Sequence, residues 1–359
     1  MEREARNPAA ARNDVLGRRS FISGAALLGA STMMSAAAMP APGPTTPGTL
    51  RFCAFADIHY APKSFPHDTR EWLERILQRA MKTKCDMVIH MGDFTHTPHV
   101  CRDYVDFYND FKLPCYHTIG NHDDDGNVHE QTLDAYRLER SYYHFDRNGF
   151  RFVVTDTNHC LIDGKWVHYS KGNYFAVGRA NSSNISRVSP AQLEWMKATI
   201  ESSPYPCIVT SHASYERAKW GSPDGDAVRA IFNEANARHP GRVRLVINGH
   251  HHHDNVRILD NIVYLDLNSA SYEWMPKAHS AYPADYTTRW RQASHTVMWD
   301  DPISAIITIS QDGRIRVEGE KSRFHLGITP EMAKCPVADA NGRLTTPDIQ
   351  SFDLQMRYT

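Results

Sequence analysis

The sequence has no excess of either charge and no long apolar run beyond its first 38 residues. Its 359 residues include 40 Lys and Arg against 41 Asp and Glu, for a formal net charge of -1. A chain without net positive charge has no general electrostatic attraction to nucleic acid or anionic lipid. A stretch that spans a bilayer needs about 20 apolar residues, and none is present after residue 38. These absences exclude a polytopic membrane protein and argue against a nucleic-acid partner.

Cysteine is scarce and scattered. The seven Cys form no C-x-x-C pair, so the sequence indicates neither a disulfide framework nor a zinc knuckle. Cys53, Cys115 and Cys207 fall inside apolar segments, where Cys acts as a small hydrophobic residue. With 41% hydrophobic residues, 20 Gly and 20 Pro, the composition is that of a folded globular protein.

Histidine is the residue type in which the chain is rich, with 20 copies. Its neutral ring binds transition metals and its pKa suits proton transfer near pH 7. The positions of these side chains therefore carry most of the functional information.

The first 38 residues have the order of an export signal. The first 20 hold five Arg and no Lys, and they end in Arg18-Arg19-Ser20 before a weakly apolar stretch, 21–38, that closes with three Ala. This order resembles a twin-arginine signal, which would engage the Tat export machinery and give a periplasmic or otherwise extracytoplasmic protein. A membrane anchor is the alternative, but Gly24, Gly29 and four Ser or Thr make the segment poorly hydrophobic for a spanning helix.

Folding is expected to begin after a Pro-rich linker, 39–49. We expect a catalytic domain over 50–320 and a C-terminal extension, 321–359, that packs on it. Apolar periodicity predicts strands at 50–56, 86–91, 115–119, 142–147, 150–156, 206–211 and 242–248, and helices at 68–84, 99–111, 189–202 and 224–238. Alternation of this kind predicts a mainly parallel sheet covered by helices.

The remaining segments predict other kinds of structure. Residues 255–267 and 303–318 are expected to form hairpins, turning at Asp260-Asn261 and Gln311-Asp312-Gly313, in a second sheet or a mixed edge. Residues 157–188 and 271–300 are aromatic-rich and irregular, which is typical of loops that wall a pocket.

Ligand-type residues follow nearly every predicted core strand. The five blocks are Asp57-Ile58-His59, Gly92-Asp93, Gly120-Asn121-His122-Asp123, His212 and Gly249-His250-His251-His252. The carboxyl ends of parallel strands share one sheet edge, so these residues are expected to meet in one crevice. Buried carboxylates and imidazoles would be costly there without divalent cations.

These blocks resemble, in order, the pattern D-x-H, G-D, G-N-H-[DE], H, G-H-x-H of the calcineurin-like metallophosphoesterases. The resemblance covers roughly residues 50–320. It implies a four-layer α/β/β/α sandwich with two mixed sheets. The D-x-H form and His96, at the place of a Tyr in the purple acid phosphatases, point away from that branch. The pattern of blocks resembles that of class III cyclic nucleotide phosphodiesterases and related bacterial phosphatases.

The resemblance also implies two divalent transition-metal ions, and Mn, Fe, Zn and Co all suit the mixed N and O ligands. The implied ligands are Asp57, His59 and His252 for one ion, Asn121, His212 and His250 for the other, and Asp93 as a bridge. His122 would stay off the metals and contact the phosphoryl or leaving oxygen, with Asp123 orienting its ring. For Asp123 an ordinary turn residue is the alternative.

We expect no direct role in metal binding for the other histidines. His251 and His253 alternate with the implied ligands, so we expect them in solvent or behind the ligands. His96, His99, His117, His129, His144, His159 and His279 are scattered and are expected to be ordinary surface or core residues. Tyr215, Arg217 and Trp220 follow His212 and could line the pocket.

The predicted function is an exported binuclear-metal phosphohydrolase. It would cleave phosphomonoesters or phosphodiesters of small molecules by in-line attack of a hydroxide held between the ions, without nucleic-acid binding and without stable membrane insertion of the mature form. The alternatives are a periplasmic His-rich metal-binding protein without turnover and a scaffold that serves interactions. The complete Gly120-Asn121-His122-Asp123 block argues against the metal-binding protein, because a pure binder has no need of His122. The intact set of ligands argues against the scaffold.

Overall fold

The computed structural model describes residues 48–171, 173–217, 219–275, 280–333 and 345–358. The predictions for residues 1–38, for nearly all of the linker and for His279 lie outside this part of the chain. The described residues fall within one unit that runs from Pro40 to Thr359. No helix within them combines the length and the apolar character that a membrane crossing requires.

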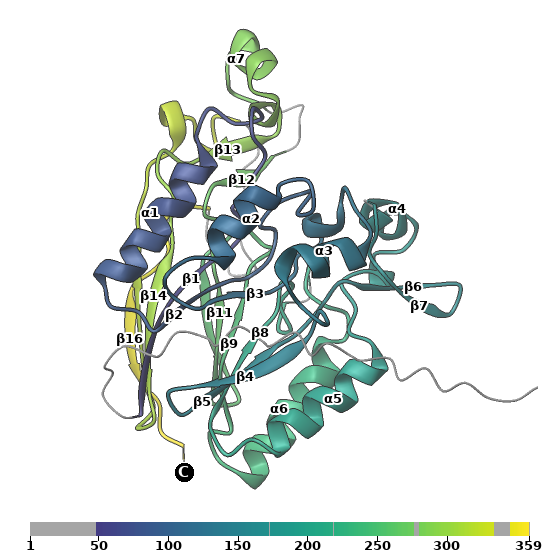
Figure 1. Ribbon diagram of the computed structural model, residues 1–359, viewed down its shortest axis with the longest axis vertical. Coiled ribbons are helices and arrows are strands. Elements are labelled where there is room, and N and C mark those ends of the chain that lie inside the picture. The colour runs from purple at the N-terminus through teal and green to yellow at the C-terminus, as the bar shows by residue number, and fades with distance from the viewer. Residues whose placement is uncertain (1–47, 172, 218, 276–279, 334–344, 359) are drawn as a thin grey trace, which may run out of the picture. The chain divides into compact units, whose positions relative to one another are not determined.

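Two six-stranded sheets form the centre of the fold (Figure 1). The first sheet has the order β16-β15-β14-β1-β2-β3 and the second β10-β11-β9-β8-β5-β4. The strands of the first are β1 (Thr49–Phe55), β2 (Met87–His90), β3 (Cys115–His117), β14 (Ala305–Ser310), β15 (Arg314–Gly319) and β16 (Phe352–Gln355). Those of the second are β4 (Tyr143–Arg147), β5 (Phe150–Val154), β8 (Cys207–Thr210), β9 (Val243–Asn248), β10 (Asn255–Leu259) and β11 (Ile262–Asp266).

Both sheets have a parallel centre and antiparallel edges. Strands β1, β2 and β3 run parallel, as do β5, β8, β9 and β11. The two predicted hairpins form β14–β15 and β10–β11. Asp260 and Asn261 both have positive φ, which matches the two-residue turn expected of this pair. The sheets are therefore mixed, and their parallel strands deliver several carboxyl ends to one side.

Alternation along the strands divides the apolar residues into separate layers. In β1, Phe52 and Ala54 pack between the two sheets, whereas Cys53 and Phe55 face the helices. Helices α1 (Thr69–Lys82), α2 (Arg102–Asn109) and α3 (His129–Tyr136) pack on the first sheet. Helices α5 (Pro190–Glu201) and α6 (Gly225–Arg238) pack on the second (Figure 1). This is the four-layer α/β/β/α sandwich, so the fold prediction is confirmed.

The two segments expected to be irregular contain short regular elements. Residues 157–188 hold the hairpin β6 (His159–Ile162) and β7 (Lys165–His168) and helix α4 (Asn173–Ala180), and residues 271–300 hold β12 (Tyr272–Trp274), α7 (Ala284–Arg289) and β13 (Thr296–Met298). Helix α3 and strand β16 are further elements that the sequence did not indicate. All are three to eight residues long, which is too short for a periodic signal. Strand β16 joins the first sheet through β15.

Candidate metal centre

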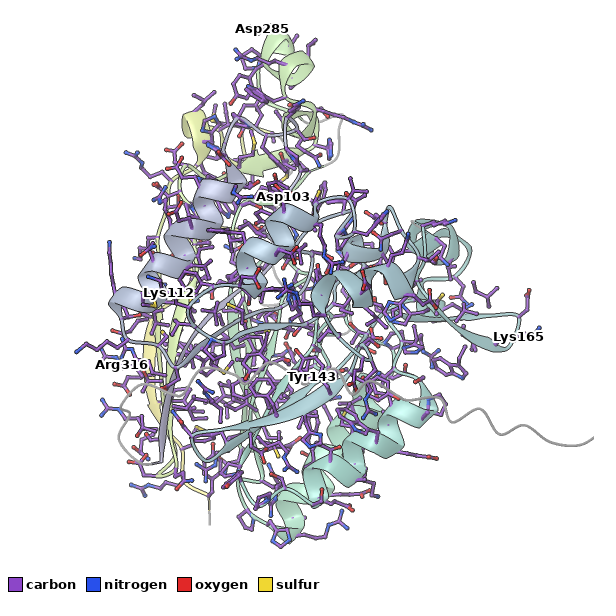
Figure 2. The ribbon with its side chains drawn as sticks, in the orientation of Figure 1. Asp103, Lys112, Tyr143, Lys165, Asp285 and Arg316 are labelled. Carbon is purple, nitrogen blue, oxygen red and sulfur yellow. The ribbon has the colours of Figure 1, made fainter. Side chains whose placement is uncertain are left out.

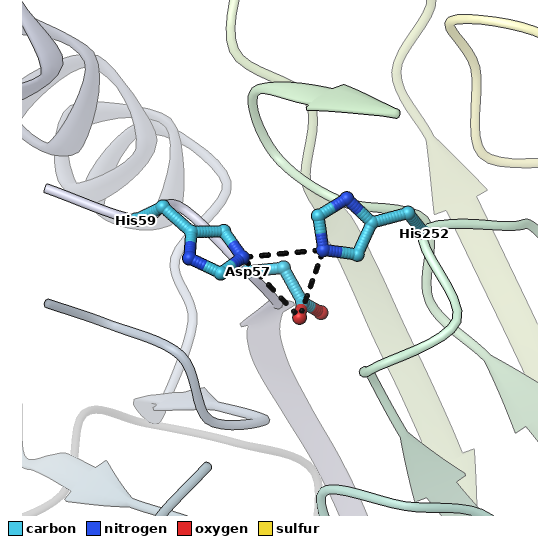
Figure 3. A group of neighbouring side chains, drawn as sticks. All are labelled: Asp57, His59 and His252. Atoms are coloured by element: carbon cyan, nitrogen blue, oxygen red, sulfur yellow. Dashed lines mark hydrogen bonds and ion pairs between the residues drawn. The ribbon is translucent and has the colours of Figure 1, made fainter. Parts of the chain in front are cut away.

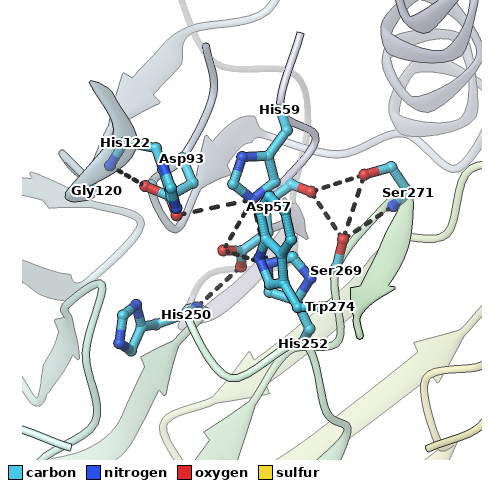
Figure 4. Close-up of polar contacts among 12 residues, drawn as sticks. Asp57, His59, Asp93, Gly120, His122, His250, His252, Ser269, Ser271 and Trp274 are labelled. Atoms are coloured by element: carbon cyan, nitrogen blue, oxygen red, sulfur yellow. Dashed lines mark hydrogen bonds and ion pairs between the residues drawn. The ribbon is translucent and has the colours of Figure 1, made fainter. Parts of the chain in front are cut away.

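Side chains from five loops meet at the carboxyl ends of β1, β2, β3, β8 and β9. Figure 4 shows those from the loops after β1, β2, β3 and β9. The seven implied ligands and His122 all lie there, although 195 sequence positions separate Asp57 from His252. Asp57 and His59 are fully buried, and Asp93, Asn121, His212 and His252 are nearly so. Strands β1 and β2 are neighbours in one sheet, and β8 and β9 are neighbours in the other. The site therefore combines residues from both sheets.

The first group of ligand atoms belongs to Asp57, His59 and His252 (Figure 3). Nε2 of His59 lies 3.2 Å from Nε2 of His252. Oδ1 of Asp57 lies 3.3 Å from Nε2 of His252 and 3.8 Å from Nε2 of His59. Three ligand atoms thus face one another within a space that a single ion can fill.

The second group belongs to Asp93, Asn121, His212 and His250. Nε2 of His212 is the common neighbour, 3.2 Å from Nδ1 of His250, 3.1 Å from Oδ1 of Asn121 and 3.2 Å from Oδ2 of Asp93. Two imidazole nitrogens, an amide oxygen and a carboxylate oxygen form a mixed set that suits a divalent transition metal.

One carboxylate belongs to both groups. Oδ2 of Asp93, which lies beside His212, is also 3.7 Å from Nε2 of His59. Its other oxygen accepts a hydrogen bond of 2.8 Å from the backbone N–H of His122, which fixes the orientation of the carboxylate. Asp93 therefore lies where the implied bridging ligand is needed.

The residues fit metal ions in their protonation as well as in their position. Nδ1 of His212 donates to the carbonyl of Met91 at 2.7 Å, and Nδ1 of His252 donates to that of Tyr272 at 2.6 Å. When the ring is neutral, each Nε2 is then free of a proton and directs a lone pair into the site. Oδ1 of Asp57 is buried and accepts no hydrogen bond from the described residues. Facing lone pairs and an unpaired carboxylate oxygen are costly unless cations lie between them.

The backbone is strained at the ligands. Asp57, His59, Asp93, His250 and His252 all have φ between 48° and 70°, a region that residues with a Cβ rarely occupy. Close approach adds a requirement for glycine, because a Cβ on Gly120 would lie 2.2 Å from Oδ1 of Asp93. The blocks thus require a local backbone conformation that is energetically unfavourable for most residues.

The carboxylate beside the His122 ring is that of Asp125. Its Oδ2 contacts Nδ1 of His122 and lies 3.1 Å from Nδ1 of His96. Asp125 is three residues after His122, at the end of the 3-10 helix η1 (His122–Asp124), so the two side chains share a face. We therefore correct the prediction that Asp123 orients His122 and assign that contact to Asp125.

Asp123 has a different task. Its carboxylate accepts hydrogen bonds from the backbone N–H groups of Asp93, Phe94, Thr95 and Gly120 and from the hydroxyl of Tyr136. These contacts tie the loop after β2 to the loop after β3. Through these hydrogen bonds, four to backbone N–H groups and one to a hydroxyl, Asp123 holds the loops that present the ligands.

His96 and Asp125 are the site residues that sequence reasoning missed. Nε2 of His96 lies 3.1 Å from Nδ1 of His59, so His96 stands directly behind an implied ligand. Asp125 is spaced i,i+3 from His122, and on a helical turn this spacing places the two side chains side by side. The sequence analysis did not predict that turn. His96 had no such signal beyond its position three residues after Asp93.

The remaining candidates lie away from the ligand atoms. Ring nitrogens of His253 contact the His251 carbonyl and the Thr345 hydroxyl, behind the ligands as expected. Tyr215 packs in the core against α6 instead of lining a pocket, and Arg217 pairs with buried Asp266 at 3.0 Å. Trp220 is exposed.

Two clusters of Asp and His that share one carboxylate, at the strand ends of an α/β/β/α sandwich, define the class of metal-dependent phosphoesterases. Residues 50–254 match the family model described as calcineurin-like phosphoesterase, and the chain belongs to this family. It is accordingly a metal-dependent phosphoester hydrolase by family. A search of curated proteins found no match.

Solved structures were found to be similar to this chain at low sequence identity, and one of those described here has a TM-score above 0.5. The chain is similar to a dimetal phosphatase from Danio rerio, with 15% identity, a TM-score of 0.53 and coverage of 76% of this chain and 96% of that one. The Plasmodium inner membrane complex anchor GAP50 gives 14% identity, a TM-score of 0.47 and coverage of 87% and 90%. An archaeal phosphodiesterase gives 11% identity, a TM-score of 0.34 and coverage of 76% and 100%.

Proposed function

We propose that this protein is an exported phosphohydrolase that uses two divalent transition-metal ions to cleave phosphomonoesters or phosphodiesters of small molecules. One observation carries the proposal: Oδ2 of Asp93 lies 3.7 Å from a nitrogen of the first ligand group and 3.2 Å from one of the second. A shared carboxylate is the arrangement that places two ions side by side. Paired ions supply a nucleophile from water at neutral pH and neutralise charge on the phosphoryl group.

The protein's own groups supply the proton. Burial opposes a charge on His122, but the carboxylates of Asp93 and Asp125 outweigh it and, from the protein's charges alone, raise the pKa of His122 to about 9. Asp125 holds Nδ1, so Nε2 is the ring nitrogen that can donate to a leaving oxygen. His122 would thus act as the general acid and Asp125 would position it.

Chromogenic esters test the proposal. With added manganese, the protein is expected to hydrolyse p-nitrophenyl phosphate, bis-p-nitrophenyl phosphate or both, to lose this activity with EDTA and to regain it when manganese is restored. The measurement is release of p-nitrophenolate alongside the metal content of the same sample. Two bound ions with no hydrolysis of either ester would instead favour the metal-binding alternative.

Within the family we propose the branch that resembles class III cyclic nucleotide phosphodiesterases. The support is the D-x-H first block together with His96, whose ring contacts His59 where a tyrosinate ligand would otherwise be expected. A panel of cyclic nucleotides, nucleotides, glycerophosphodiesters and sugar phosphates, run on the manganese-loaded protein, identifies the ester class that it prefers.

We also propose export through the twin-arginine route. Replacing Arg18 and Arg19 together by Lys keeps the positive charge but removes the pair that the export receptor reads. The precursor is then expected to accumulate in the cytoplasm, as measured by immunoblot of cell fractions. Arg12→Lys is the matched control and leaves export unchanged. Normal export of the double variant would contradict the proposal.

A further inference from the structure

Trp274 lies at the edge of the hydrolytic centre, by which we mean the seven implied ligands together with His122. Its ring centroid is 5.8 Å from that of His122, 5.6 Å from that of His59 and 5.9 Å from that of His252 (Figure 4). The imidazole of His295 lies nearly parallel to the indole, with planes 13° apart and centroids 5.4 Å apart. Trp274 belongs to none of the five blocks of the sequence, and the family resemblance assigns it no role.

The segment that carries Trp274 is fastened to two of the implied ligands. Nδ1 of His252 donates to the carbonyl of Tyr272 at 2.6 Å. The hydroxyl of Ser269 donates to the carbonyl of Asp57 at 2.8 Å. The indole of Trp274 therefore has a defined position relative to the ligands, so it is already placed when a substrate arrives.

Trp274 differs in exposure from two other aromatic neighbours of the centre. Tyr272 stacks on His59 with ring centroids 5.1 Å apart, and Tyr174 meets His250 edge-on at 6.3 Å. These tyrosines are buried, with 0% and 6% of their surface exposed, whereas Trp274 is partly exposed. A partly exposed indole beside the ligands can contact a bound molecule without any rearrangement of the core.

The orientation of His122 indicates which part of a substrate lies beside Trp274. Asp125 contacts Nδ1 of His122, and His96 is next to the same carboxylate, so Nε2 is the nitrogen that faces the leaving oxygen. When the phosphorus–oxygen bond breaks, this oxygen takes the proton of Nε2 while an oxygen from water forms the new bond to phosphorus. The group attached to the leaving oxygen is then the part of the ester nearest to Trp274.

An indole favours flat aromatic partners. Aromatic pairs in offset-stacked or edge-to-face arrangements are stabilised beyond the area that they bury. A saturated ring of the same size buries a similar area but lacks this additional stabilisation. Because the ring centroids of Trp274 and His122 are 5.8 Å apart, an aromatic ring joined to the leaving oxygen directly or through one carbon can reach the indole.

We propose that Trp274 is a specificity-determining residue that selects phosphate esters whose leaving group carries a planar aromatic ring. This inference rests on the proposed function and names the substrate class of the same site. Aryl alcohols, benzylic alcohols and nucleosides all supply such a ring, and the indole recognises the feature that they share.

Binding of phosphonates, which the protein cannot hydrolyse, tests the inference. Benzylphosphonate and cyclohexylmethylphosphonate have equal charge and the same number of carbon atoms, but only the first has an aromatic ring. With the manganese-loaded full-length protein, isothermal titration calorimetry is expected to give a Kd about 3- to 10-fold lower for benzylphosphonate. Trp274→Leu is expected to remove this difference. Trp220→Leu, which changes an exposed residue away from the ligands, is the matched control and keeps it.

The ratio of the two Kd values separates recognition from structural support. A variant that only distorts the centre would weaken both phosphonates equally, and the metal content of each sample reports such damage. Trp274→Phe keeps a smaller aromatic face and is expected to give an intermediate ratio, which provides the test if Trp274→Leu does not fold. Equal or undetectable binding of both phosphonates by the wild type, or an unchanged ratio in a folded Trp274→Leu variant, would overturn the inference.

Two further comparisons identify the source of the ring and the point of any failure. A preference for AMP over ribose 5-phosphate that disappears in Trp274→Leu would identify a nucleobase as the ring, and its absence would leave aryl or benzylic esters. If the manganese-loaded protein hydrolyses no ester, the proposed function fails. A phosphonate ratio that depends on Trp274 would still support recognition of the ring in that case.

Discussion

Asp93→Asn is expected to abolish hydrolysis and to weaken the binding of both ions of the hydrolytic centre together. The change removes the only carboxylate charge shared by the two ligand groups while it keeps the shape of the side chain. Charge stabilisation by paired ions contributes several kcal/mol, so kcat is expected to fall by about 10³-fold or more. Steady-state kinetics and metal content measured on the same preparation provide the check.

The matched control for this change is Asp103→Asn. Asp103 lies on α2, its side chain is 77% exposed and it takes no part in the ligand groups (Figure 2). This variant is expected to keep wild-type kcat and metal content. If Asp93→Asn kept two ions and a normal rate, or lost one ion alone, the bridging assignment would be wrong.

His122→Ala is expected to separate catalysis from metal binding. His122 touches Asp125 through its ring and Asp93 through its backbone N–H, and the latter contact survives truncation of the side chain. The variant should therefore keep its metals while kcat falls by about 10²- to 10⁴-fold, the range for loss of a general acid. Metal loss as severe as that of Asp93→Asn would show that His122 is a ligand instead.

Two companion variants separate the neighbouring carboxylates. Asp125→Asn removes a group that raises the pKa of His122, so kcat is expected to fall about 10- to 100-fold and the alkaline limb of its pH profile to move to lower pH. Asp123→Asn leaves backbone N–H groups without their acceptor and is expected to lower the free energy of unfolding by about 3 kcal/mol. If Asp123→Asn moved the pH profile and Asp125→Asn did not, the original assignment to Asp123 would stand.

The parts of this site that could be predicted are those fixed by local backbone chemistry. Asp57, Asp93 and Asn121 follow β1, β2 and β3 by two to four residues. Gly92, before Asp93, has positive φ, and Gly120, before Asn121, allows the close approach of the Asp93 side chain. Such constraints act over a few residues and leave a pattern in the sequence. Five such patterns in one order were enough to indicate the family, the sandwich and the ligand set.

The parts that were missed depend on partners distant in the chain or on turns too short to leave a period. His96 matters because the loop after β2 brings it against His59, 37 positions earlier. The residues of the β6–β7 hairpin alternate but are weakly apolar. Their sequence pattern therefore did not indicate that His159 and His168 lie beside Asp124 and Asp156. Scattered histidines that look ordinary in the sequence thus formed a second buried cluster.

The amino-acid sequence by itself determined which residue types stand at the end of each core strand, and with them the chemistry that the protein can support. Only the tertiary structure decided which carboxylate serves which imidazole. Asp123 adjoins His122 in the chain and Asp125 lies three residues after it, yet the helical turn directs Asp125, and not Asp123, at the His122 ring. Side-chain direction depends on backbone torsion and on packing between sheets, and neither is a property of sequence spacing.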